Sequence, residues 1–301
     1  MAGKRQIPET LFDDLGFRMT YEAKRVIYEA QTEHQHLVLF EHSFFGKILM
    51  LDGATQVTTA DEFVYHEMMT HVPILAHGNA REVLIVGGGD CGIAEEVLKH
   101  KAVKRLTQVE IDASVVEFSK EHFPEFTKPV LADKRFDLII ADGMKYVAKT
   151  DRRFDVIIVD STDPHGPGKV LFSQKFFAAC RRCMTTGAVM VTQNGVPMFQ
   201  PGELTSAVVK RRKLFADSYC YIAAIPTYVG AIWPWGGPPM TPGCVRFRSR
   251  ASLSATARLA ASRPNIGLRR CTWRHSRYPV SLPKTLRKQI GGSRGCAVHD
   301  V

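Results

Sequence analysis

The 301-residue sequence lacks any apolar run close to the roughly 20 residues that a membrane-spanning helix needs. Its first residues, Met1-Ala-Gly-Lys-Arg-Gln, are not followed by the apolar segment of a signal peptide. We therefore expect a cytoplasmic protein that does not associate with a membrane.

Cysteine is scarce and irregularly spaced. The seven residues are odd in number and scattered, which argues against a disulfide framework. Cys180 and Cys183 form one CxxC pair, but it lies in a helical pattern and has no second pair to complete a metal site. We expect these two cysteines to pack within a helix.

Acidic residues are nearly absent from the C-terminal segment. Residues 231–301 hold thirteen Lys and Arg and one acid, Asp300, whereas the other 230 residues hold 27 basic and 29 acidic groups. The net charge of +10 therefore comes from the tail, and the body is mildly acidic. An acidic body suits a cationic substrate. The basic tail leaves nucleic-acid binding as a weaker hypothesis.

The first 60 or so residues contain short β-rich runs at 26–30, 36–40 and 47–51, and Asp52-Gly53 is a hairpin signal. They predict a small antiparallel N-terminal β-domain. A helix follows at 61–76, with Asp61 as its expected N-cap. We place the end of this domain, connecting helix included, at residue 72.

Residues 73–230 alternate between strand and helix patterns. The expected strands are 81–86, 105–110, 136–140, 154–160, 188–193 and 219–225. This order predicts a doubly wound α/β domain with a mostly parallel sheet, in which ligands bind beyond the carboxyl ends of the strands.

A glycine-rich turn follows the first of these strands. Gly87, Gly88 and Gly89 allow the backbone to approach a nucleotide-like ligand closely. Asp90 comes next, and its charge would repel a phosphate. The turn therefore predicts a cationic ligand rather than a dinucleotide.

Carboxylates follow four successive strands, at Asp90, Glu110, Asp142, Asp160 and Asp163. Each alone could be a helix cap, a role that Asp142 fits well, but five at one rim favour a binding site. Glu110 follows Gly87 at the spacing expected of an acid that binds ribose hydroxyls. Asp142 and Gly143 could bind an adenine amino group.

Asp160 and Asp163 are close enough for one to hold an ammonium group and the other to accept a proton. A metal is a weaker hypothesis here, because no dedicated ligand cage surrounds them. His66 and His71 also do not predict zinc, since residues five apart on a helix point about 140° from each other.

Together these stretches resemble the spermidine synthases, the polyamine aminopropyltransferases. The resemblance extends to about residue 230 and rests on five motifs: Leu51-Asp-Gly-Ala-Thr-Gln, Asp61-Glu-Phe-Val-Tyr-His-Glu-Met-Met-Thr-His-Val-Pro, Val86-Gly-Gly-Gly-Asp, Val109-Glu-Ile-Asp and Ile158-Val-Asp-Ser-Thr-Asp-Pro-His-Gly-Pro-Gly. It implies a methyltransferase-like α/β domain beside the N-terminal β-domain, in a homodimer.

The resemblance also implies a reaction, the transfer of an aminopropyl group from decarboxylated S-adenosylmethionine to putrescine. No metal and no cofactor besides this co-substrate is implied. Asp160 would be the proton acceptor. The donor would contact Gln35, Glu110, Asp142, Gly143 and Pro167. The amine end and the diamine pocket would be formed by Tyr65, His66, Asp90, Asp160, Ser161, Thr162, Asp163, Gln193 and Tyr228.

The sequence departs from the family pattern in places. Cys91 replaces a glycine after Asp90, Glu95 replaces an arginine, and residues 124–135 look shortened. Residues 231–281 lose the family pattern, which returns at 281–291. A shifted reading frame over 231–281 is our hypothesis for this basic C-terminal segment, 231–301, and a disordered insertion is the alternative.

Two other functions remain open: an S-adenosylmethionine-dependent methyltransferase on the same fold, and a nucleic-acid-binding protein that uses the basic tail. Asp90 opposes the first, because the carboxylate of ordinary S-adenosylmethionine would lie near it. The acceptor is also open, since cadaverine or a longer polyamine differs from putrescine only in length.

Overall fold

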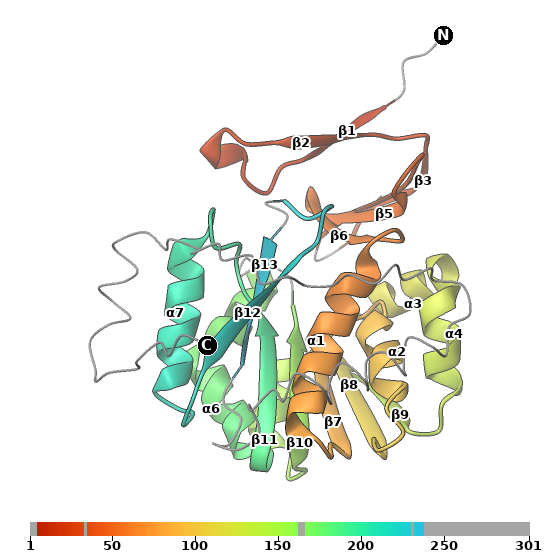
Figure 1. The fold of residues 1–301 in the computed structure, drawn as a ribbon. Coiled ribbons are helices and arrows are strands. Elements are labelled where there is room, and N and C mark those ends of the chain that lie inside the picture. Colours follow the sequence, from red (N-terminus) through yellow and green to blue (C-terminus); the bar gives the residue numbers. More distant parts are fainter. Residues whose placement is uncertain (1–4, 33–34, 162–165, 230–231, 238–301) are drawn as a thin grey trace, which may run out of the picture. The chain divides into compact units, whose positions relative to one another are not determined.

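A seven-stranded sheet lies at the centre of the fold (Figure 1). The computed structural model describes residues 5–32, 35–161, 166–229 and 232–237, which all fall within one unit, Met1–Val245. The frameshift hypothesis therefore lies almost wholly outside the described residues.

The N-terminal region contains two antiparallel sheets. The first pairs β1 (Gln6–Glu9) with β2 (Met19–Glu22), which a short 3-10 helix, η1 (Asp13–Leu15), separates. The second contains, in spatial order, β3 (Arg25–Gln31), β4 (His36–His42), β5 (Gly46–Leu51) and β6 (Ala54–Thr58). The predicted antiparallel β-domain is confirmed. The β1–β2 pair was not predicted, because runs of four residues are too short to show a strand pattern.

The central sheet has the strand order β12 (Tyr219–Ala224), β13 (Ile232–Gly237), β11 (Met184–Gln193), β10 (Phe154–Asp160), β7 (Glu82–Gly87), β8 (Arg105–Glu110) and β9 (Phe136–Ile140). The five strands from β11 to β9 are parallel, and β13 is antiparallel to both β11 and β12. The predicted doubly wound, mostly parallel sheet is confirmed.

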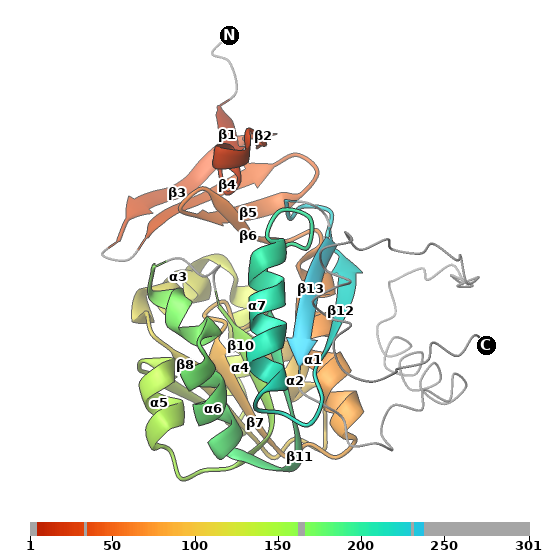
Figure 2. The same cartoon turned by 90° about the vertical axis from the view of Figure 1, so that its left-hand side faces the viewer.

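Helices cover both faces of this sheet (Figures 1 and 2). They are α1 (Glu62–His77), α2 (Gly92–Leu98), α3 (Ala113–His122), α4 (Pro124–Ala132), α5 (Gly143–Lys149), α6 (Gln174–Arg182) and α7 (Pro201–Arg212), with a 3-10 helix, η2 (Gly166–Phe172), before α6. Figure 2 shows α5, α6 and α7 along one side. None of the helices within these described segments is long and apolar enough to cross a membrane.

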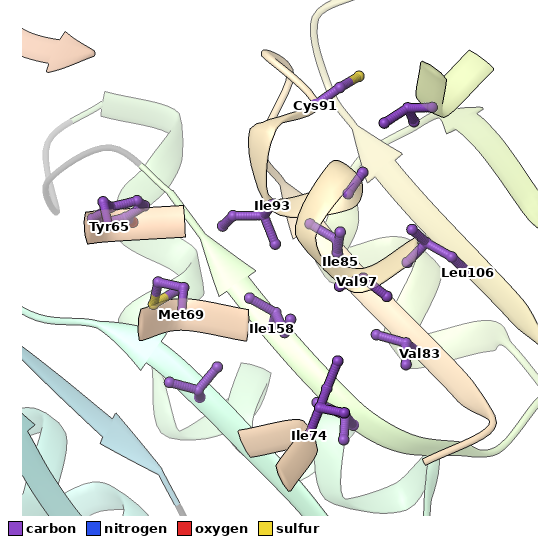
Figure 3. Packing of buried hydrophobic residues seen from close by; sticks show 14 of the residues in the cluster. Tyr65, Met69, Ile74, Val83, Ile85, Cys91, Ile93, Val97, Leu106 and Ile158 are labelled. Carbon is purple, nitrogen blue, oxygen red and sulfur yellow. The ribbon is translucent and has the colours of Figure 1, made fainter. Parts of the chain in front are cut away.

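The strands bury side chains on both faces, as expected for a parallel sheet. Val83 and Ile85 of β7 join the cluster with α1 and α2, part of which Figure 3 shows, and Leu84 and Val86 join the cluster with α5 and α6. Cys180, on α6, and Cys183, the C-cap residue of α6, lie in the second cluster as buried free thiols, so both pack in the core as expected although only Cys180 is inside the helix.

Asp61 is the N-cap residue of α1, as predicted, but its side chain does not make the capping hydrogen bond expected of an aspartate there. Its carboxylate instead accepts hydrogen bonds from the Thr58 hydroxyl (2.7 Å) and from the backbone N–H (3.0 Å) and hydroxyl (2.7 Å) of Thr227. These contacts with Thr227, far away in the sequence, take the place of the local capping hydrogen bond. Asp61 holds the 225–229 loop against the start of α1, which matters because Tyr228 lies in that loop.

Two elements of the α/β domain were not predicted. Residues 124–132, part of the segment that looked shortened, form α4, with Pro124 in its first turn, where the missing N–H of proline costs nothing. Ile232–Gly237 forms β13, which lies in the basic C-terminal segment 231–301. Its Trp, Pro and Gly residues show no alternation, so the strand depends on pairing with β11 and β12.

Candidate active site

The glycine turn after β7 lies directly against the end of β10. Gly87 has a positive φ of 90°, and a Cβ there would overlap the backbone oxygen of Asp160. The side-chain amide of Gln108, on β8, donates to the carbonyl oxygens of Gly87 (3.1 Å) and Gly88 (2.5 Å). The turn is therefore fixed from two neighbouring strands.

Asp160, at the end of β10, faces helix α1. The Tyr65 hydroxyl donates a 2.6 Å hydrogen bond to its Oδ1. Burial, helped by the charge of Asp90, raises the pKa of Asp160 to about 6, although Tyr65 and His66 oppose the shift. Asp160 is thus ionised near neutral pH and able to take up a proton.

His66 lies between two carboxylates. Its Nδ1 is 2.6 Å from Oε2 of Glu62, one turn earlier on α1, and its Nε2 is 3.3 Å from Oδ2 of Asp90. The other Asp90 oxygen accepts the backbone N–H of Gly92 at 2.9 Å. Tyr65, His66, Asp90 and Asp160 therefore form one contiguous group.

Two further predicted residues border this group. The Tyr65 and Tyr228 rings pack edge to face at 5.8 Å, and the Tyr228 hydroxyl donates to the carbonyl oxygen of Gln56. The side-chain amide of Gln193, at the end of β11, donates to the carbonyl oxygen of Ser161 at 2.6 Å. Both are buried, so they belong to the wall beside Asp160.

Glu110 is buried at the end of β8. Its Oε1 accepts the backbone N–H of Asp112 at 3.0 Å, and burial raises its pKa to about 7. A Cβ at Gly89 would lie 3.2 Å from its Oε2, so this carboxylate and the glycine turn share one space. A partly protonated, buried carboxylate is suited to hydrogen bonding with hydroxyl groups.

Asp142 has the helix-capping role that the sequence allowed. Its Oδ1 accepts the backbone N–H of Lys145 at 3.0 Å at the start of α5. Gly143 is packed so closely that a Cβ would meet the Val86 side chain. Both residues follow β9, next to the strand that carries Glu110.

The structure shows no direct contact between the remaining predicted residues and the group around Asp160 within the described part of the chain. Gln35 lies in the turn before β4, where its backbone bonds to Thr32, and no described contact joins its side chain to Asp160, Asp90 or Glu110. The backbone of Pro167 is part of η2. Thr162 and Asp163 lie outside the described residues.

His71 points away from His66, as the helical spacing predicted. Its Nε2 contacts Glu96 at 3.1 Å and its Nδ1 contacts His100 at 2.9 Å. One ligand atom each of Glu67, His71 and Glu96 lies within 4.8 Å of the other two, but Lys99 already pairs with Glu96. The group therefore joins α1 to α2 as an ion-pair network.

Sequence reasoning missed three residues that shape the site: Glu62, Gly92 and Gln108. Glu62 could have been found, because it precedes His66 by four residues on a helix. Gly92 and Gln108 carry no such signal, since their contacts come from other elements.

Comparisons with known proteins agree with this geometry. Residues 62–236 match the spermine/spermidine synthase domain, and residues 9–59 match the spermidine synthase tetramerisation domain. The chain is 53% identical over 230 residues to polyamine aminopropyltransferase 1 of Pseudomonas aeruginosa, covering 76% of this chain and 80% of the relative. It is 51% identical to a polyamine aminopropyltransferase of Ruegeria, covering 71% and 75%.

Solved structures give the same result. A spermidine synthase crystallised with the transition-state analogue AdoDATO matches with a TM-score of 0.77 and 33% identity, over 80% of this chain and 82% of that one. Spermidine synthase from Thermotoga maritima matches with a TM-score of 0.74 and 31% identity, over 80% and 81%. With the acidic site at the ends of β7, β8 and β10, these matches establish that the chain belongs to the spermine/spermidine synthase family of polyamine aminopropyltransferases.

Proposed function

We propose that the chain transfers the aminopropyl group of decarboxylated S-adenosylmethionine to putrescine, giving spermidine and methylthioadenosine. The observation that carries this proposal is the Tyr65–Asp160–Asp90–His66 group at the ends of β10 and β7. Both substrates carry positive charge, and buried carboxylates stabilise such ligands.

Asp160 is the proton acceptor in this proposal. An ammonium group has no lone pair, so putrescine must lose a proton before it can attack. With a pKa of about 6, Asp160 is mostly ionised near pH 7. The freed amine forms a bond to the methylene carbon beside the sulfonium, the carbon–sulfur bond breaks, and its electron pair neutralises the sulfur.

The donor lies along the ends of β7, β8 and β9 in this proposal. Glu110 binds the ribose hydroxyls, and Asp142 with Gly143 binds the adenine. Gln35 and Pro167 complete the donor site. Asp90 and His66 lie at the amine end, where an acid favours a donor without a carboxylate over ordinary S-adenosylmethionine.

The diamine lies on the other side of Asp160. The buried Tyr228 and Gln193, together with Tyr65, support this position, and Gln193 also fixes the backbone of Ser161. Thr162 and Asp163 follow Ser161 directly in the chain, and we assign Asp163 to the distal ammonium group.

We also infer a homo-oligomer, with a homodimer as its unit. The match of residues 9–59 to a tetramerisation domain supports assembly through the N-terminal β-domain. Light scattering coupled to size-exclusion chromatography measures the state directly, and a monomer at all concentrations would contradict this inference.

Mass spectrometry of the products tests the function. The purified full chain is incubated with putrescine and either donor, decarboxylated or ordinary S-adenosylmethionine. We expect spermidine and methylthioadenosine from the decarboxylated donor alone. Methyl transfer without aminopropyl transfer would overturn the proposal, and cadaverine and spermidine in place of putrescine define the acceptor range.

A further inference from the structure

The buried His66 ring has a carboxylate oxygen at each of its nitrogens. Glu62 lies 2.6 Å from Nδ1, and Asp90 lies 3.3 Å from Nε2. An ionised carboxylate can only accept hydrogen bonds, so both contacts are favourable only when both ring nitrogens carry protons. A ring protonated at both nitrogens is an imidazolium.

The surroundings support this charge state. The ring of Phe126, on α4, lies 5.8 Å from that of His66, and the Tyr65 ring lies 5.9 Å from it, so both neighbours are uncharged. The charge of the ring also acts on Asp160, and Glu62 and Asp90 contact the ring directly. Burial alone would lower the pKa of His66, but these two carboxylates more than offset it and raise the pKa well above its usual value.

Gly92 lies directly against the imidazole ring. A Cβ at this position would overlap three atoms of the imidazole, so the ring is packed directly against the start of α2. The N–H of the same residue donates to Asp90 at 2.9 Å. Gly92 therefore orients both members of the His66–Asp90 pair.

We propose that Glu62 is a positioning residue that keeps His66 as an imidazolium against Asp90, leaving one net negative charge at the amine end of the cleft. This inference rests on the proposed function, since it assigns a role to a residue that touches neither substrate. The charge state of His66 also affects the proton acceptor, Asp160, because Asp90 raises the pKa of Asp160 while His66 lowers it. Tyr65 also faces Asp160, and Glu110 lies beyond it.

Neutralising Glu62 tests the inference. In the full chain carrying Glu62→Gln, the carbonyl oxygen can still accept from Nδ1, but the charge that holds the second proton is gone. Glu67→Gln is the matched control on the same helix, because Glu67 lies near His71 and Glu96 instead.

The first readout needs no catalysis. Nitrogen NMR of histidine-labelled protein, with His66 assigned through His66→Gln, reports the protonation of both ring nitrogens. We expect an imidazolium at pH 8 in the wild type and in Glu67→Gln, and a ring pKa lower by about one pH unit or more in Glu62→Gln.

The second readout is the pH dependence of kcat/KM. Glu62→Gln should lower kcat/KM at every pH at which His66 is still charged, because the imidazolium then cancels Asp90 and the amine end has no net negative charge to attract the cationic donor; Glu67→Gln should leave the profile unchanged. Gly92→Ala should also lower kcat/KM, by displacing the ring.

A neutral His66 ring in the wild type at pH 8 would overturn the inference. This measurement tests the inference even if Glu62→Gln does not fold. An unchanged ring pKa in a folded Glu62→Gln would overturn it equally. If no aminopropyl transfer is found but the ring behaves as expected, the proposed function fails and the charge state of His66 stands.

Discussion

The Tyr65 hydroxyl donates a 2.6 Å hydrogen bond to Oδ1 of Asp160, linking helix α1 to the end of strand β10. The hydrogen bond favours the ionised carboxylate, so it opposes the effect of burial on the pKa of Asp160. We predict that Tyr65→Phe raises this pKa by about one pH unit and moves the acidic limb of kcat/KM upward by the same amount.

The control is Tyr28→Phe, at an exposed tyrosine on β3 that makes no contact with Asp160. It should leave the pH profile unchanged. An unshifted limb in Tyr65→Phe, with turnover otherwise normal, would show that this hydrogen bond does not tune the base.

Asp160→Asn removes the proton acceptor and preserves the shape of the side chain. We expect kcat to fall by about 10²- to 10⁴-fold, the usual contribution of a general base. Methylthioadenosine binding, measured by calorimetry, should survive, because Glu110 and the glycine turn are unchanged. Unchanged turnover would exclude Asp160 as the base.

The wild-type profile should have a matching acidic limb. Below about pH 6 Asp160 is protonated and cannot accept another proton, so kcat/KM should rise with pH up to that value. The measurement is initial rates from pH 5 to 9 in a buffer of constant ionic strength. A profile without a limb near pH 6 would contradict the assigned pKa.

Much of the fold could be read from the sequence because apolar runs mark the strands so clearly. The strands at 105–110, 136–140 and 154–160 match β8, β9 and β10 at both ends. The errors occur where contacts between residues far apart in the sequence determine the local structure. Asp61 looks like an N-cap locally, but Thr227, 166 residues later, takes its carboxylate.

The candidate site was predicted as a list of residues, and the list gives no distances. Strand-end carboxylates could be placed at one rim from topology alone. The Glu62–His66–Asp90 arrangement could not, because it depends on how α1 packs against the loop after β7. Motif matching also assigns no role to Glu62, which lies one turn from the chemistry.

Arg211, on α7, is a buried cation without a carboxylate partner among the described residues. Its Nη1 donates to Thr192 (2.6 Å) and Asn194 (3.0 Å), Nε and Nη2 have no oxygen or nitrogen acceptor, and the Cys220 thiol lies beside the guanidinium. Burial lowers its pKa to about 10, which shows how unfavourable the charge is there. We predict that Arg211→Met stabilises the fold by about 1 kcal/mol or more.

Differential scanning calorimetry should show this gain as a rise in Tm of about 2–4 °C per kcal/mol. Arg212→Met changes the exposed neighbour and should have no such effect. A lower Tm in Arg211→Met would mean that its hydrogen bonds to Thr192 and Asn194 outweigh the cost of burying the guanidinium.

The buried carboxylate of Glu110 destabilises the fold when it is ionised, although the proposed donor site needs it to bind the ribose hydroxyls. Its pKa is raised by burial from 4.5 to about 7, so the folded state binds its proton more tightly than the unfolded state does. Stability from this group is therefore greatest below pH 4.5 and falls as the pH rises toward 7. Above pH 7 the ionised carboxylate costs the fold about 3 kcal/mol.

We therefore predict that Glu110→Gln makes the unliganded chain more stable at pH 8 but not at pH 5, where wild type and variant are both neutral. It should also bind methylthioadenosine about 10- to 100-fold more weakly, because a charged acceptor is lost. Thermal unfolding at both pH values with and without methylthioadenosine measures both effects. Glu117→Gln, an exposed change on α3, should show neither. Equal stability changes at the two pH values would contradict the raised pKa of Glu110.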